Sequence, residues 1–120
     1  MSLLEQTQKL TEEFMAGQPD DARNTIEQAF GSIMEAGFGA DALREGDQTA
    51  EFYLPNVRGG ETYLSELLAE GPVVLSFYRG GWCPFCNLEF KALQDVLPQI
   101  EELGAKLVGV SPELPNNSMS

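Results

Sequence analysis

The two cysteines, Cys83 and Cys86, lie three residues apart in the stretch RGGWCPFC, and the 120-residue chain contains no other cysteine. The apolar run VVLSFY before them predicts a strand, and the apolar spacing after them predicts a helix, so the pair should lie where that helix begins. Backbone N–H groups and the helix dipole at such a position stabilise a thiolate, the nucleophilic form of cysteine. The spacing also permits a disulfide between the two sulfurs, and it therefore indicates redox chemistry.

Metal binding, a structural role and hydrolysis are the alternatives for this pair. A zinc site needs about four ligands, commonly Cys and His, but the chain has two cysteines and no histidine. Zinc or an iron–sulfur cluster would therefore need a second subunit or carboxylate ligands, and we expect no metal. Without histidine the thiol–imidazole pair of cysteine proteases cannot form. A buried pair of inert thiols stays open as the structural alternative.

Two neighbouring side chains could assist the cysteines. Arg79 lies just after the end of the predicted strand, four residues before Cys83, where its charge could favour a thiolate or bind an anionic group. It could equally be a surface arginine. Trp82 could shield the sulfurs, or it could only cover the edge of the core. Because Cys83 is placed at the mouth of the helix and Cys86 within its first turn, we expect Cys83 to be the more exposed sulfur.

The elements around the pair form a βαβ unit. Its predicted parts are a strand at 73–78, a helix at 84–103 and a second strand at 105–111, which should run parallel through a right-handed connection. The first strand is apolar throughout except at Ser76, which predicts that both its faces are covered. Pro98 should kink or split the helix.

The rest of the chain reads as a helical extension followed by turns. Amphipathic patterns predict two helices before residue 37, which form an N-terminal helical extension at 1–43, and a separate part is expected at 44–120. The extension could be a cap packed on the domain or a docking surface. A short extended piece is expected at 52–54, and one or two helical turns follow, with Ser65 as an N-cap candidate.

The charge balance disfavours several partners. The 7 Lys and Arg residues against 19 Asp and Glu residues give a net charge of -12, which repels nucleic acid and anionic membranes. No apolar run approaches the roughly 18 residues that span a bilayer, and the N-terminus lacks the basic and apolar regions of a signal peptide. We therefore expect a cytoplasmic protein, where a close cysteine pair is more often catalytic than a permanent disulfide.

The segments GPVVLSFYRGGWCPFCNLEFKALQ and GAKLVGVSPELP resemble the thioredoxin-like superfamily, and more narrowly the peroxiredoxin-like proteins of the alkyl hydroperoxide reductase/thiol-specific antioxidant family. The resemblance is specific over 71–115. It implies an α/β fold class, with a thioredoxin-like βαβ half and an N-terminal helical extension. Residues 44–120 would then be the N-terminal part of a thioredoxin-like domain, and the thioredoxin fold would be incomplete. In that family the strand at 73–78 lies between the strand at 106–110 and one from the half that has no counterpart here, so one edge should be unpaired.

The resemblance implies a thiol-dependent peroxidase that uses no cofactor and acts as an antioxidant. One cysteine would reduce a hydroperoxide, a Cys83–Cys86 disulfide would follow, and a thiol donor such as thioredoxin or glutaredoxin/glutathione would restore the thiols. The peroxiredoxin pattern places its attacking cysteine on Cys86, with Cys83 at its Thr position and Arg79 at its Pro position. Thioredoxins with WCxxC attack with the first cysteine, which is Cys83 here, so the order stays open.

Two further functions stay open beside the peroxidase. The first is a thioredoxin- or glutaredoxin-like dithiol–disulfide oxidoreductase that uses the same pair on protein disulfides. The second is a non-catalytic interaction module that binds through the helical extension, or an inactive fragment. A homo-oligomer is compatible with all three, because an unpaired strand edge can pair with another chain.

Overall fold

The computed structural model describes residues 1–118, which divide into two compact units. The larger unit consists of residues 51–118 together with residues 1–3, and the smaller consists of residues 4–50. The predicted extension at 1–43 therefore falls in the smaller unit apart from its first three residues. Both cysteines belong to the larger unit, which holds all the strands.

Two helices precede the strands, as predicted. α1 spans Leu3–Ala16 and α2 spans Asp20–Glu35, and neither contains a buried residue. Pro19 occupies the N-cap of α2 with an extended backbone. Large apolar side chains of α2 remain exposed, including Phe30 at 66%. The amphipathic pattern thus predicted the helices.

The larger unit begins with a hairpin. β1 (Tyr53–Pro55) pairs antiparallel with β2 (Glu61–Tyr63), and α3 (Leu64–Glu70) follows directly. The turn is closed by the Asn56 N–H, which donates to the Gly60 carbonyl at 2.9 Å. The extended piece expected at 52–54 is therefore one strand of a hairpin, displaced by one residue.

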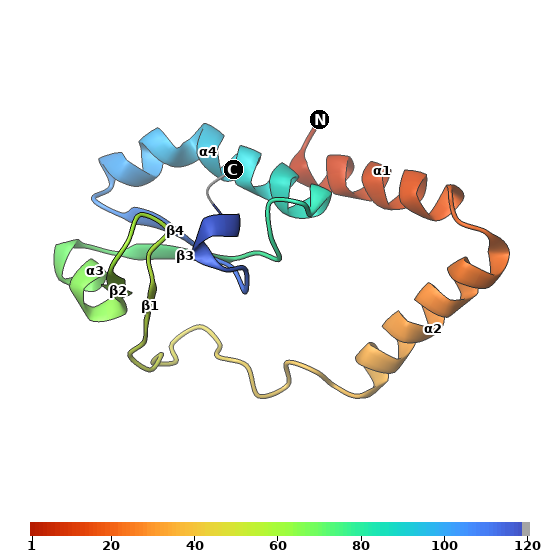
Figure 1. The fold of residues 1–120 in the computed structure, drawn as a ribbon, viewed down its shortest axis with the longest axis horizontal. Coiled ribbons are helices and arrows are strands. Elements are labelled where there is room, and N and C mark those ends of the chain that lie inside the picture. The colour runs from red at the N-terminus through yellow and green to blue at the C-terminus, as the bar shows by residue number, and fades with distance from the viewer. Residues whose placement is uncertain (119–120) are drawn as a thin grey trace. The chain divides into compact units, whose positions relative to one another are not determined.

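The predicted βαβ unit is present and its strands are parallel. β3 (Val73–Phe77) leads into α4 (Pro84–Glu102), which leads into β4 (Lys106–Val110). The register runs from Val73 opposite Lys106 to Phe77 opposite Val110. Figure 1 shows α4 running along one side of the strand pair. A single 3₁₀ turn, η1 (Pro115–Asn117), follows β4.

α4 continues through Pro98 as one helix, so of the two predicted effects, a kink or a split, the split does not occur. Proline lacks an N–H group and leaves the carbonyl four residues earlier without its helical partner. That carbonyl belongs to Gln94, and because Gln94 and Pro98 are both exposed, water can solvate it. Gly104 follows the helix with a φ of 76°, a conformation that glycine adopts readily.

β3 pairs with β4 alone among residues 1–118, so its other edge has no strand beside it. The same strand is not covered on both faces, because Phe77 is 70% exposed. An apolar pattern indicates that both faces of a strand should be covered, but it does not show which residues cover them. None of the helices within residues 1–118 is both long and apolar enough to cross a bilayer.

Glu51 takes the capping role that the sequence assigned to Ser65. Tyr63 is the N-cap residue of α3 and makes no side-chain cap bond. The Glu51 carboxylate instead accepts the N–H of Ser65 at 3.1 Å and that of Phe52 at 3.0 Å. The hydrogen bond with Ser65 and these N–H donors outweigh desolvation and lower the pKa of Glu51 below its ordinary value of 4.5. A side chain before the hairpin thus secures the start of α3.

We predict that Glu51→Gln lowers the urea midpoint of the larger unit at neutral pH, because a neutral amide is a weaker acceptor at a helix start than a carboxylate. Since the folded-state pKa is depressed, this stabilisation is fully present above about 4.5 and is lost as the pH falls through the folded-state value. The midpoint difference between wild type and variant should therefore shrink in acid. Glu45→Gln is the charge-matched control, and a Glu51→Gln difference that grows in acid would contradict the assignment.

Candidate active site

Cys83 is the N-cap residue of α4, with an extended backbone, and Pro84 occupies the first helical position. Proline suits that position because its fixed φ fits a helix and its missing N–H is not needed there. The Cys83 sulfur accepts the backbone N–H of Cys86 at 3.5 Å. The prediction that the pair lies at a helix start is confirmed by this placement.

The two sulfurs are in direct contact. Cys86 Sγ donates to Cys83 Sγ at 2.8 Å, and both cysteines are free thiols. A disulfide bond is about 2.05 Å long, so the sulfurs need to approach by less than about 1 Å to form one. The geometry therefore suits the formation of a local Cys83–Cys86 disulfide when an oxidant accepts the two electrons.

The exposure of the two cysteines is the reverse of the expectation. Cys83 is buried, with 2% of its surface exposed, whereas Cys86 is half-buried. One reason is the cap: to accept the Cys86 N–H, the Cys83 sulfur turns back onto the first turn of α4. Cys86 is the more accessible thiol of the pair.

Several contacts determine the acidity of Cys83. Burial opposes ionisation, but the Cys86 thiol, the N–H groups of Cys86 and Phe85, and the positive charge of Arg79 together outweigh it and lower the pKa of Cys83. Hydrogen bonds at a helix start favour the charged form of a cysteine. These contacts therefore favour the thiolate form of Cys83.

Arg79 and Trp82 both stand beside the pair. The Arg79 guanidinium lies 4.7 Å from the centroid of the Trp82 ring, within the range of a cation–π contact. Trp82 is 60% exposed, and its indole N–H donates to the Glu113 carboxylate at 2.8 Å. Trp82 thus forms part of a polar contact and is not buried against the core.

Sequence reasoning missed Glu113 and Ser111 as parts of this site. Ser111 Oγ donates to the Arg79 carbonyl at 3.3 Å and accepts the Glu113 N–H at 3.1 Å. A usable signal existed, because both residues follow β4 directly, and the carboxyl ends of neighbouring parallel strands meet at one edge of a sheet. The segment after β4 therefore faces the loop after β3.

An aromatic contact fixes α4 on the strands below the pair. The rings of Tyr78 and Phe90 meet edge to face with centroids 4.6 Å apart. Gly109 makes room for them, since a Cβ there would lie 3.2 Å from Phe90 and 3.3 Å from Tyr78. The start of α4 is held over the end of β3 by this packing.

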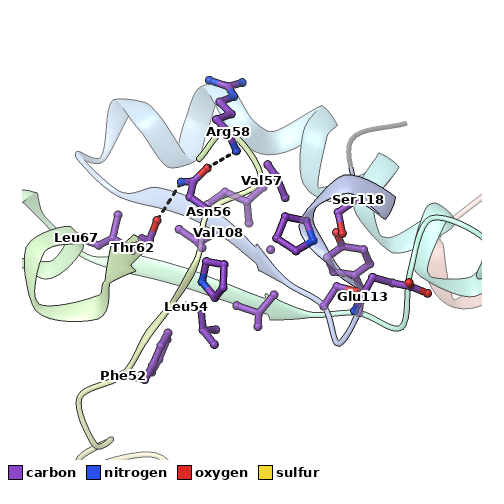
Figure 2. Close-up of a pocket in the computed structure, with 17 residues that line it drawn as sticks. Phe52, Leu54, Asn56, Val57, Arg58, Thr62, Leu67, Val108, Glu113 and Ser118 are labelled. Carbon is purple, nitrogen blue, oxygen red and sulfur yellow. Dashed lines mark hydrogen bonds between the residues drawn. The ribbon is translucent and has the colours of Figure 1, made fainter. Parts of the chain in front are cut away.

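A groove of about 410 Å³ lies between the hairpin and β4. Figure 2 shows Asn56 among the lining residues, where its amide donates to the Thr62 hydroxyl and accepts the Arg58 N–H. Glu113 lines the groove, but neither cysteine does. Among residues 1–118, His, Cys, Asp and Glu side chains form no group of three that could hold a metal ion.

Comparison with known proteins places these features in a family. The model of the AhpC/TSA family matches residues 46–120. A Mycobacterium tuberculosis protein named as a peroxiredoxin is 38% identical over 71 residues, which cover 59% of this chain and 46% of that protein. The thiol-disulfide oxidoreductase ResA of Halalkalibacterium halodurans is 30% identical over 92 residues, or 75% of this chain and 51% of ResA.

A solved structure supports the same grouping. The crystal structure of peroxidoxin BcpB from Mycobacterium tuberculosis is similar with a TM-score of 0.57 and 37% identity, over 61% of this chain and 47% of that one. The expected α/β fold class with a thioredoxin-like βαβ unit is confirmed by these matches. The chain spans about half the length of the relatives it matches. Because the family model covers more than half of the chain, the protein belongs to the AhpC/TSA family.

Proposed function

We propose that the chain carries the redox centre of a thiol-dependent peroxidase, in which Cys83 and Cys86 reduce hydroperoxides. The observation that carries the proposal is the 2.8 Å contact between the two sulfurs at the start of α4. Its support from the comparisons is membership of the AhpC/TSA family and similarity to proteins named as peroxiredoxins.

In the first step, the Cys83 thiolate attacks the terminal oxygen of the hydroperoxide. The O–O bond breaks, the alkoxide leaves and takes a proton from solvent, and Cys83 becomes a sulfenic acid. Cys83 is assigned this role because its lowered pKa favours the nucleophilic form. A small oxidant is required, since only 2% of Cys83 is exposed.

In the second step, the Cys86 sulfur attacks the sulfenic sulfur, the disulfide forms and water leaves. Cys86 needs no large movement, because its sulfur already contacts that of Cys83. An external thiol donor of the thioredoxin, glutaredoxin or glutathione class then supplies two electrons and restores both thiols. This recycling requires a reducing compartment, and we therefore place the reaction in the cytoplasm.

A dithiol–disulfide oxidoreductase is the second candidate function. Similarity to ResA and the capping position of Cys83 favour it. Burial of Cys83 counts against it, because a protein disulfide must reach the attacking sulfur directly. Peroxide consumption and insulin reduction, measured on the same samples, separate the two functions.

We expect Cys83→Ser to lose peroxide consumption, because this variant lacks the attacking thiolate. We expect Cys86→Ser to form a persistent sulfenic acid on Cys83, because it lacks the thiol that condenses with the sulfenic acid. Peroxide consumption and dimedone labelling measure the two effects. Full consumption by Cys83→Ser would assign the first attack to Cys86. Insulin reduction without peroxide consumption would favour the oxidoreductase.

The acidity of Cys83 gives another prediction. Cys86→Ala should raise the pKa of Cys83, because it removes the thiol donor that favours the thiolate. Cys86→Ser keeps a donor and should lie closer to wild type. The rate at which iodoacetamide alkylates Cys83 itself, followed on the Cys83 peptide by mass spectrometry, is measured against pH. The midpoint of that curve gives the pKa of Cys83 independently of how accessible the sulfur is. A Cys86→Ala midpoint at or below that of wild type would remove the proposed role of this donor.

Arg79→Ala should also raise the pKa of Cys83 and slow its alkylation at neutral pH, because it removes a nearby positive charge. We expect a smaller effect than that of Cys86→Ala, since the contact with Cys86 contributes more to lowering the pKa. Arg58→Ala removes the same charge from the hairpin turn and serves as the control. Equal alkylation rates in the two arginine variants would return Arg79 to an ordinary surface arginine.

A further inference from the structure

The loop that carries Arg79 and Trp82 is fastened to the segment after β4 by the indole of Trp82. Its N–H donates to Glu113 Oε1 at 2.8 Å, across 31 positions of sequence. Because 60% of Trp82 is exposed, burial of the ring contributes little to its placement. The hydrogen bond and the Arg79 guanidinium over the ring hold the indole in place.

Glu113 is itself oriented by the same loop. Its N–H donates to Ser111 Oγ at 3.1 Å, and Ser111 Oγ donates to the Arg79 carbonyl at 3.3 Å. The loop after β3 and the segment after β4 are therefore joined twice, once through the indole of Trp82 and once through the hydroxyl of Ser111. The carboxylate is held toward the indole, so the contact is not an isolated pair of surface side chains.

The turn below the indole links this contact to the buried cysteine. A Cβ at Gly80 would collide with the Trp82 indole nitrogen and would lie 3.1 Å from Glu113 Cγ. The Gly80 carbonyl accepts the Cys83 N–H at 3.1 Å. The turn from Gly80 to Cys83 thus has the indole packed against its first residue and the reactive sulfur on its last.

We propose that Glu113 is a positioning residue, and that its bond to Trp82 keeps this turn closed and Cys83 buried. The Trp82–Glu113 contact then limits which reagents reach the Cys83 sulfur, and it favours small oxidants over protein disulfides. The inference rests on the proposed function for the reactive role of Cys83. The test of the Trp82–Glu113 contact uses no hydroperoxide. The role of this contact and the proposed peroxidase function can therefore be rejected independently of each other.

The test measures alkylation of Cys83 by iodoacetamide in the reduced Cys86→Ser background. Loss of a hydrogen bond of this kind should raise the population of the open turn roughly five-fold, and the alkylation rate of Glu113→Ala should rise with it. Trp82 is the single tryptophan, so its emission reports on the contact directly. Glu113→Ala should shift that emission to longer wavelength.

Two variants separate the contact from charge and from unfolding. Glu113→Gln removes the charge but keeps a side-chain oxygen that accepts the indole N–H, so its alkylation rate and emission should stay near those of the background. Trp82→Phe keeps an aromatic ring without the donor and should accelerate alkylation as Glu113→Ala does. Glu102→Ala on α4 controls for the loss of one exposed carboxylate.

The double variant Trp82→Phe, Glu113→Ala completes the cycle. Its alkylation rate should match that of either single variant, because one contact cannot be lost twice. Additive rate increases would overturn the proposal, and so would a Glu113→Gln rate equal to that of Glu113→Ala, which would assign the effect to charge. An unchanged rate in both single variants would also overturn it. Far-UV circular dichroism of Glu113→Gln and Trp82→Phe shows whether each is folded.

Discussion

The hydrogen bonds accepted by the Cys83 sulfur at the start of α4 are the interaction on which the rest of the site depends. The Cys86 thiol and the Cys86 N–H both point at this sulfur. The first backbone N–H groups of a helix have no acceptor within the helix. A cysteine at the N-cap can accept them, and they favour a negative charge on its sulfur. The same hydrogen bonds turn the sulfur away from solvent, so the contacts that lower the pKa of Cys83 also contribute to its burial.

The surrounding elements hold this helix start in place. β3 ends beneath it, and the Tyr78–Phe90 contact fixes α4 against the strands. The segment after β4 then reaches the loop through Ser111 and Glu113. A parallel βαβ unit brings these pieces together because the carboxyl ends of its two strands lie at one edge. The position of the cysteine pair therefore depends on contacts between residues that lie far apart in sequence.

Local sequence patterns predicted the helix start, the parallel strands and the closeness of Arg79 and Trp82 to the pair. They failed where the answer depends on side-chain direction or on distant residues. Spacing alone placed Cys83 at the helix mouth and suggested exposure, but the direction of its sulfur decides its burial. The hydrogen bond between Trp82 and Glu113 joins residues 31 positions apart. The spacing of apolar residues within one helix or strand cannot predict such a contact.

The proposed roles of Cys83 and Cys86 can be tested by the intact mass of the reduced chain, taken with thiol trapping after one equivalent of hydroperoxide. We expect a loss of two hydrogens, with neither thiol available to the trapping reagent, because the neighbouring Cys86 converts the sulfenic acid of Cys83 into a disulfide. Dithiothreitol should restore both thiols. A wild-type species that keeps one added oxygen, or a chain that retains both free thiols, would exclude these roles.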